Sequence, residues 1–323
     1  MPDLHRGQEI YTFFNIYGIN GLVGLILSIV FMGTIIYKTF KIITGNNIET
    51  YQEFLRKIIP VKLKDNKILG FTINNIINIF LFISFNIMVA GFATYFLQEL
   101  NISKWYGAII VAAIAFITFS KNIDGVVKIN SYLIPTLIVL IVFLGIRKIN
   151  NLAAIEIYEG RKTLYWILSS VLYASYNSIT LMPILISLKK YIKTGKESKL
   201  ISIFTITIML VLSITIFLLM NLFIKQISNI EIPIIYIAST LGKGFKYIYG
   251  LAVLIAIFTT AISTGYGFLS NIANTKRKYT IISVLICICS IFAGQLGFSG
   301  LINLMYPVFG YLGIIQIIFL LIA

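Results

Sequence analysis

Long apolar runs alternate with short, mostly basic segments along almost the whole chain. A bilayer core is about 30 Å thick, and a helix needs about 20 apolar residues to cross it. By this rule the pattern predicts about nine full membrane spans. They are residues 20–44, 69–97, 105–121, 127–147, 163–188, 200–224, 247–272, 279–297 and 301–323. We therefore expect an all-α membrane protein with a single polytopic domain over residues 1–323.

Composition agrees with this class. Hydrophobic residues make up 59% of the chain and charged residues 11%, far from the mix of a soluble globular domain. The net charge of +15 comes from basic residues in the short polar segments. Because these residues do not gather on one soluble face, nucleic acid is not an expected partner, whereas the lipid bilayer is. No protein partner is indicated.

The basic residues also predict the orientation. Roughly twice as many Lys and Arg residues fall on the side with segments 38–67, 189–199 and 276–278 as on the other. By the positive-inside rule that side is cytoplasmic, and so is the carboxyl terminus. The abundance of Ile, Asn and Lys is what AT-rich codons produce, which favours a bacterial plasma membrane.

Two shorter segments lie outside the full spans. Residues 8–18 form an amphipathic piece that, at about 1.5 Å per residue, covers about half the membrane. The loop at 226–243 has Pro233 near a plausible helix start, followed by an apolar run. This loop predicts either a short external helix over the bundle or an ordinary ordered loop.

Catalytic signatures are missing. There is no P-loop, no HExxH and no pair of aspartates for a metal-bound diphosphate, and the single histidine, His5, lies at the terminus. We therefore expect no enzyme activity, no metal site and no cofactor.

A polar island lies in the span 163–188, where the run YASYNSIT begins at Tyr173 and is followed by Pro183. Such an interruption at membrane depth needs a cavity or a neighbouring helix to satisfy its polar groups. The candidates for solute contact are Tyr173, Ser175, Asn177 and Ser178. The alternative is a proline-kinked helix whose polar groups bond to neighbouring helices.

A second polar island lies in the span 247–272. Hydroxyl side chains occur there at i, i+4 spacing and form two adjacent stripes on one side of a helix. Hydroxyl oxygens are hard ligands that suit a small cation. The candidates for ion contact are Thr259, Thr260, Ser263 and Thr264. The alternative is that these hydroxyls bond to their own helix carbonyls or join helices.

The two halves of the chain can be paired. Residues 7–18 and 177–188 have the same length, which divides the chain into repeats at 1–150 and 160–323 with five membrane elements each. An odd number of spans per half places the repeats in opposite orientation, the plan of many secondary transporters. On this comparison, the first half of the opening helix is largely absent.

The stretch GQEIYTFFNIYGINGLVGLILSIVFMGTIIYK, followed by ETYQEF, resembles the YkvI family of bacterial membrane proteins, related to the amino acid, polyamine and organocation (APC) superfamily. That family has a glycine-rich approach of the kind GAGFASGQE, of which only Gly7, Gln8 and Glu9 match here. The resemblance implies a LeuT-like 5+5 inverted-repeat bundle with a truncated first helix, and a central site between helices one, three, six and eight.

The residues Gly7, Gln8 and Glu9 thus become candidates for solute binding. Ionisable groups are costly at membrane depth and functional by default, so Glu9 could carry a proton, bind an ammonium group or join a salt bridge, for example with Arg6. The alternative for Glu9 is a carboxylate that caps the first turn of its own helix.

Together these features predict a secondary active transporter. We expect it to move a small amino-acid-like, cationic or zwitterionic solute, coupled to Na⁺ or H⁺ by alternating access. Two alternatives stay open, namely a non-transporting membrane sensor or assembly subunit with the same fold, and an N-terminally truncated transporter product.

Overall fold

A computed structural model describes residues 7–46, 48, 51–60, 67–120, 124–149, 158–187, 189, 192, 194–227 and 230–323. The described ranges are helices joined by short connections, with no strand among them, which confirms the expected all-α class. The first half comprises α1 (Gln8–Phe13), η2 (Asn15–Tyr17), α2 (Ile19–Gly45), α3 (Tyr51–Ile58), α5 (Lys67–Leu100), α6 (Lys104–Phe119) and α7 (Asp124–Lys148). The second half comprises α8 (Tyr165–Ser187), α9 (Gly195–Leu222), α10 (Ile224–Ile227), α11 (Pro233–Ser239), α12 (Lys243–Ile272), α13 (Lys276–Ala293) and α14 (Phe298–Ile322).

Six of the helices contain a stretch long and apolar enough to cross a membrane. These stretches lie in α2, α5, α7, α9, α12 and α14. The other three predicted spans are also helical, but α6 has only 16 residues, α8 carries the polar island and α13 begins with three basic residues. The structure therefore supports a multi-span membrane protein, and the count of nine spans stays a prediction.

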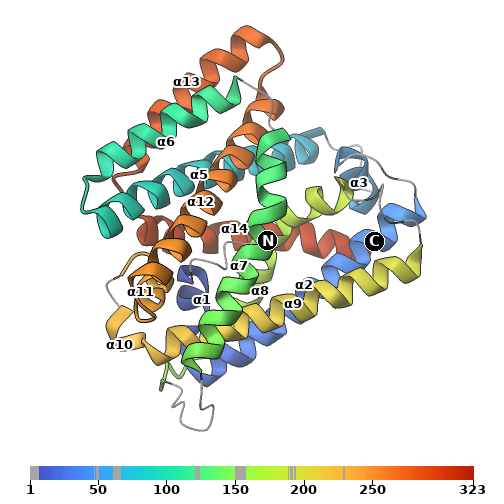
Figure 1. The fold of residues 1–323 in the computed structure, drawn as a ribbon. Helices are drawn as coiled ribbons and strands as arrows, with labels where there is room; N and C mark the ends of the chain where they lie inside the picture. Colours follow the sequence, from blue (N-terminus) through green and yellow to red (C-terminus); the bar gives the residue numbers. More distant parts are fainter. Residues whose placement is uncertain are drawn as a thin grey trace.

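The long helices pack in pairs of distant segments. The closest partners are α8 with α14, α5 with α12, and α2 with α8 and α9, while α6 lies against α5 and α13. Figure 1 shows α6 and α13 side by side at one edge, α2 and α9 side by side at another, and the short α1 between these groups. The interior of the bundle is thus built around α1.

Two glycines set the course of the opening segment. Gly7 precedes α1 with φ 76°, and Gly18 separates η2 from α2 with φ 57°. A Cβ atom on Gly18 would lie 2.2 Å from the carbonyl oxygen of Tyr158, so a side chain there would collide with backbone. Glycine adopts this left-handed conformation without steric cost, which lets the chain turn sharply from the short helix into the first full span.

The structure corrects the expected interruption of the helix in the span 163–188. α8 continues through the polar island and past Pro183. Asn177 Nδ2 donates to the carbonyl oxygen of Tyr173 at 2.8 Å, and the hydroxyl of Ser178 donates to that of Ser175 at 2.7 Å. The polar side chains therefore bond along their own helix, a common arrangement for such residues in helices, and no unwinding is needed to satisfy them.

A small helix covers one end of the bundle. Pro233 begins α11 at the first helical turn, as expected for the loop at 226–243, and the short helix predicted there is confirmed. The side chain of Gln98, near the end of α5, bonds to both backbone polar groups of Ile232, accepting from its N–H at 3.0 Å and donating to its carbonyl oxygen at 3.3 Å. Glu231 accepts from the backbone N–H of Ser299 at 2.9 Å. The segment before α11 is therefore fastened to α5 and to the start of α14.

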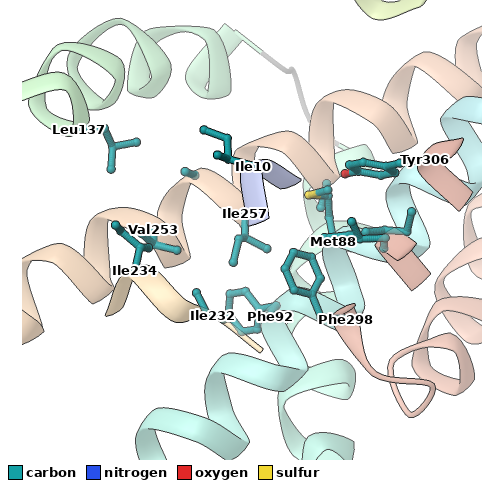
Figure 2. Close-up of a cluster of buried hydrophobic side chains, with 14 of the residues drawn as sticks. Ile10, Met88, Phe92, Leu137, Ile232, Ile234, Val253, Ile257, Phe298 and Tyr306 are labelled. Atoms are coloured by element: carbon teal, nitrogen blue, oxygen red, sulfur yellow. The ribbon is translucent and has the colours of Figure 1, made fainter. Parts of the chain in front are cut away.

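The space between α11 and α1 is filled by apolar side chains. Figure 2 shows Ile232 beside Phe92 of α5 and Ile234 beside Val253 of α12, with Ile257 of α12 between Phe92 and Ile10 of α1. Ile10, Ile232, Ile234 and Ile257 have no exposed surface. Buried apolar side chains therefore separate the α11 end from α1.

Candidate functional site

Glu9 lies in the first turn of α1 and is almost completely buried, with 1% of its surface exposed. The hydroxyl of Tyr176, on α8, donates a hydrogen bond to Glu9 Oε2. Tyr176 is 167 residues from Glu9 in the sequence. A carboxylate that only caps its own helix does not require this contact. This contact joins the two predicted repeats at one acidic group.

Tyr176 belongs to a connected cluster of five aromatic rings, which we call the aromatic cage. They come from α1, the residue that follows α1, α8 and α14, and they are Phe13, Phe14, Tyr173, Tyr176 and Tyr306. The ring of Tyr176 lies 4.7 Å from that of Tyr306, 5.5 Å from that of Tyr173 and 5.7 Å from that of Phe13, measured between centroids. Rings at such distances attract one another through favourable tilted and stacked geometries. The cage therefore holds Tyr176 in place beside Glu9.

α1 and the η2 turn that follows it are tied to three long helices by polar contacts. The hydroxyl of Ser169, on α8, donates to the carbonyl oxygen of Phe13 at 2.7 Å, and Asn15 Nδ2 donates to the carbonyl oxygen of Phe217, on α9, at 3.0 Å. The hydroxyl of Thr12 donates to Asn303 Oδ1, on α14, at 2.8 Å. The first of these contacts gives a partner to the carbonyl oxygen at the end of α1, which the helix leaves without an internal one.

Gly7 and Gln8, the other candidates near Glu9, are also buried. A Cβ atom on Gly7 would lie 2.2 Å from Cε of Met220, so α9 packs directly on the start of α1. Arg6, which the sequence suggests as a partner of Glu9, lies outside the described residues, as does His5. Gly7, Gln8 and Glu9 thus share the buried end of α1 that faces α8 and α9.

The four candidates on α8 do not all meet Glu9. Tyr173 belongs to the aromatic cage, whereas Asn177 and Ser178 donate along α8 itself. Ser175 is fully buried, and its hydroxyl has no hydrogen-bond partner among the described residues. A Cβ atom on Gly313 would lie 2.2 Å from the carbonyl oxygen of Ser175, so the backbone of Ser175 faces α14 at close range.

Two tyrosines at the site were not among the sequence candidates. Tyr176 lies inside the polar run that indicated a site, three residues after Tyr173, and helical spacing could have identified it as a neighbour of the same face. Tyr306 has no comparable signal because it is one of several aromatic residues in a mostly apolar helix. Only the packing of α14 against α8 brings it to the cage.

The candidate ion ligands on α12 bond along their own helix. Thr259 and Thr260 donate to the carbonyl oxygen of Ala256 at 3.1 and 2.8 Å, and Ser263 donates to that of Thr259 at 2.8 Å. Thr264 donates to the carbonyl oxygen of Thr260 at 2.9 Å. Thr259 and Thr264 are buried but Ser263 is exposed, so the hydroxyls do not all face the interior. These contacts fit the back-bonding alternative, and ion coordination by this set stays a prediction.

Within the described ranges, no three His, Cys, Asp or Glu side chains come together as a possible metal site. At the α11 end of the bundle, lysine and glutamate side chains form ion pairs. Lys246 lies 2.9 Å from Glu99 and Lys104 lies 3.6 Å from Glu231, measured between nitrogen and carboxylate oxygen. Among the described residues, these two ion pairs lie near α11, whereas Glu9 lies on α1 beside Tyr176.

The opposite end of the bundle is covered by α3. A crevice there is lined by side chains from α3, α5, α8 and α14, among them Leu55, Ile76, Ile179 and Gln316. Gln316 Nε2 donates to the hydroxyl of Tyr51 on α3 at 2.7 Å. Burial raises the pKa of the Tyr51 hydroxyl well above its usual value, so this hydroxyl keeps its proton at physiological pH. Ile179 is three residues from Tyr176, so the crevice approaches the aromatic cage from the α3 end.

Together these features define a multi-span α-helical membrane protein with a buried acidic site between α1, α8 and α14. No family model matches the chain. The chain is 25% identical to the uncharacterized membrane protein YkvI of Bacillus subtilis (strain 168) over 322 residues, which cover 95% of this chain and 88% of that protein. It is 24% identical to the uncharacterized protein YyaD of the same organism over 323 residues, covering 98% of this chain and 90% of that protein.

These likenesses extend over nearly the whole chain and support the expected relationship to YkvI-like membrane proteins. They carry no information on the wider APC superfamily or on the LeuT-like 5+5 arrangement, which stay predictions from the sequence.

Proposed function

We propose that the protein is a secondary active transporter of a small amino-acid-like, cationic or zwitterionic solute, coupled to Na⁺ or H⁺. The observation that carries this proposal is the contact between Glu9 and Tyr176, a buried acid and its donor inside a multi-span bundle. An acid at membrane depth is expensive to keep and marks a solute or ion pathway by default.

The two ends of the bundle support an alternating-access mechanism. The side chains of Ile76 and Gln98, which mark the α3 and α11 ends, are 22 positions apart on α5, or about 33 Å at 1.5 Å per residue. Apolar packing closes the α11 end, whereas the crevice at the α3 end approaches the cage. A site closed at one end and approached from the other is the arrangement that one state of a transporter requires.

The arrangement of the short helix supports the 5+5 inverted-repeat plan. In that plan residues 7–18 are the counterpart of residues 177–188, and Glu9 bonds to Tyr176, the residue just before that stretch. By the distribution of basic residues, the α3 end and the carboxyl terminus are cytoplasmic and the α11 end is external, in a bacterial plasma membrane.

Reconstituted protein tests the proposal. Purified protein in liposomes, supplied with an inward Na⁺ or H⁺ gradient, should accumulate at least one member of a panel of radiolabelled amino acids and amines. Protein-free liposomes and liposomes with a dissipated gradient are the controls. Absence of accumulation across the whole panel under both gradients would refute the proposal. Solute binding without flux would favour the sensor or assembly subunit.

A further inference from the structure

The short helix α3 has two chemically different sides. Phe54 and Ile58 are buried in an apolar cluster with side chains of α2, α8 and α14. On the other side Glu53, Arg56 and Lys57 are exposed, and they help to line a shallow pocket at the surface. Neither basic residue forms an ion pair with another described residue. Because the bundle itself covers the apolar side, α3 turns its basic side outward, as a helix that lies along a membrane surface does.

The position of α3 along the bundle matches the headgroup level of a bilayer. The cluster that seats α3 includes Ile35 and Ile43 of α2. Between these two residues in the sequence is Lys38, whose Nζ donates to the carbonyl oxygen of Leu321 in the last turn of α14 at 2.7 Å. A lysine near the end of a spanning helix places its charge at the membrane interface. We therefore expect the outer side of α3 at the level of phospholipid headgroups.

The charge of this region selects the kind of lipid. Positions 56 to 67 hold several basic residues and a single acid, Asp65, just ahead of the apolar part of α5. The basic residues are Arg56, Lys57, Lys62, Lys64 and Lys67. Clusters of about four to eight such residues beside a membrane span attract anionic lipids. We propose that Arg56 and Lys57 bind the headgroups of anionic phospholipids and thereby hold α3 against the bundle.

Lipid bound to this surface holds one wall of the crevice at the α3 end. Leu55 lines that crevice from α3, and the hydrogen bond from Gln316 to Tyr51 fastens α3 to α14. A helix of eight residues is not stable on its own, so such contacts decide where it lies. An anionic headgroup on Arg56 and Lys57 adds a contact that exists only while α3 stays in the interface.

Hydrogen exchange in nanodiscs tests the proposal. The protein is placed in phosphatidylcholine alone and in an equal mixture of phosphatidylcholine and phosphatidylglycerol, and exchange of the α3 backbone amides is followed by mass spectrometry. The mixture should slow exchange by about thirtyfold, which corresponds to about 1 kcal/mol for each of the two basic residues. The amides at the start of α13 show any effect of the charged surface as a whole. Equal exchange of α3 in the two lipids would overturn the proposal.

Two matched double variants assign the effect to α3. Arg56→Gln with Lys57→Gln should remove most of the slowing that phosphatidylglycerol causes. Lys276→Gln with Arg277→Gln removes the same two charges from the exposed start of α13, on the same predicted side, and should leave the slowing at α3 unchanged. Each variant is compared with itself in the two lipids, so a general change in stability cancels. Slowing that survives in the α3 variant, or that the α13 variant loses equally, would refute the assignment.

Soluble anions distinguish a lipid from other occupants. Inorganic phosphate or glycerol phosphate, added to the protein in phosphatidylcholine, should leave exchange at α3 unchanged, and slowing by either would make this surface a site for a soluble anion instead. Phosphatidylserine should reproduce the effect of phosphatidylglycerol, since the contact is one of charge. Salt should weaken the effect, because the Debye length falls from about 10 Å at about 0.1 M to about 3 Å at about 1 M. A response to one headgroup alone, or one that salt does not weaken, would contradict recognition by charge. No solute flux is measured, so these results bear on α3 and leave the transporter to its own test.

Discussion

The contact between α8 and α14 predicts a measurable cost for one added methyl group. A Cβ atom on Gly313 would lie 2.2 Å from the carbonyl oxygen of Ser175 and 2.6 Å from its carbonyl carbon. Both atoms belong to the backbone, so no side-chain rotation can relieve the overlap, and the helices must separate by about 1 Å to restore normal van der Waals contact. Gly313→Ala should therefore destabilise the bundle and move Tyr306, seven residues earlier on the same helix face, away from Tyr176.

The size of the effect follows from two opposing terms. Overpacking of this kind costs about 1–3 kcal/mol. Replacing a helical glycine by alanine gains up to about 1 kcal/mol in helix propensity. Gly300 lies on the same helix with no atom within 4 Å of its built Cβ, so Gly300→Ala keeps the gain without the overlap. The two variants should therefore differ in free energy of unfolding by about 1–3 kcal/mol.

Unfolding in mixed detergent and SDS micelles, followed by circular dichroism, measures this difference. Equal stability of the two variants would show that α8 and α14 do not approach as closely as the structure indicates, and would remove the basis for placing Tyr306 at the site.

Further variants test the opening turn and both ends of the bundle. Gly18→Ala should lower the free energy of unfolding by about 2 kcal/mol or more, because φ is positive there and the new methyl group meets the carbonyl oxygen of Tyr158; thermal unfolding checks this. Tyr51→Phe should cost about 1 kcal/mol by removing the bond to Gln316. Burial raises the pKa of the Tyr51 hydroxyl in the folded state, so the stability that this hydroxyl contributes is full below about pH 10. Above that pH the difference in free energy of unfolding between wild type and the variant should shrink, as urea or SDS titrations at several pH values can show. Gln98→Ala should leave the backbone before α11 without its two bonds and increase hydrogen exchange there, which mass spectrometry can measure.

The helical class and most helix positions could be predicted because hydrophobic length is a strong signal in membrane proteins. The short helix at 8–13 and the helix after Pro233 were also predictable, the latter because a proline at the first helical turn has a fixed structural meaning. The continuity of α8 was not, since the same serines and asparagine that suggest an unwound segment also satisfy themselves by bonding back along an intact helix.

The aromatic cage shows a different limit of the sequence. Glu9 stands out because an acid next to an apolar run is rare, and the polar run around Tyr173 stands out for the same reason. Tyr306 has no such contrast with its neighbours, so its role depends on long-range packing. Small residues make that packing possible, because Gly310 and Gly313 bring α14 against the backbone of Leu172 and Ser175. Local patterns cannot predict which tyrosine such a contact selects.

The position of the acid on a short helix has a consequence for mechanism. α1 has six residues, too few for a helix to be stable on its own, so contacts with its neighbours decide where it lies. Those neighbours are separate helices, with Ser169 on α8, Phe217 on α9 and Asn303 on α14. Glu9 adds the hydrogen bond from Tyr176, which is stronger to a charged carboxylate than to a neutral carboxyl group. A change in the charge of Glu9 therefore alters the balance of forces on α1, which lies between the α11 end and the crevice at the α3 end. An acid on a long, self-supporting helix would have far less influence on this balance.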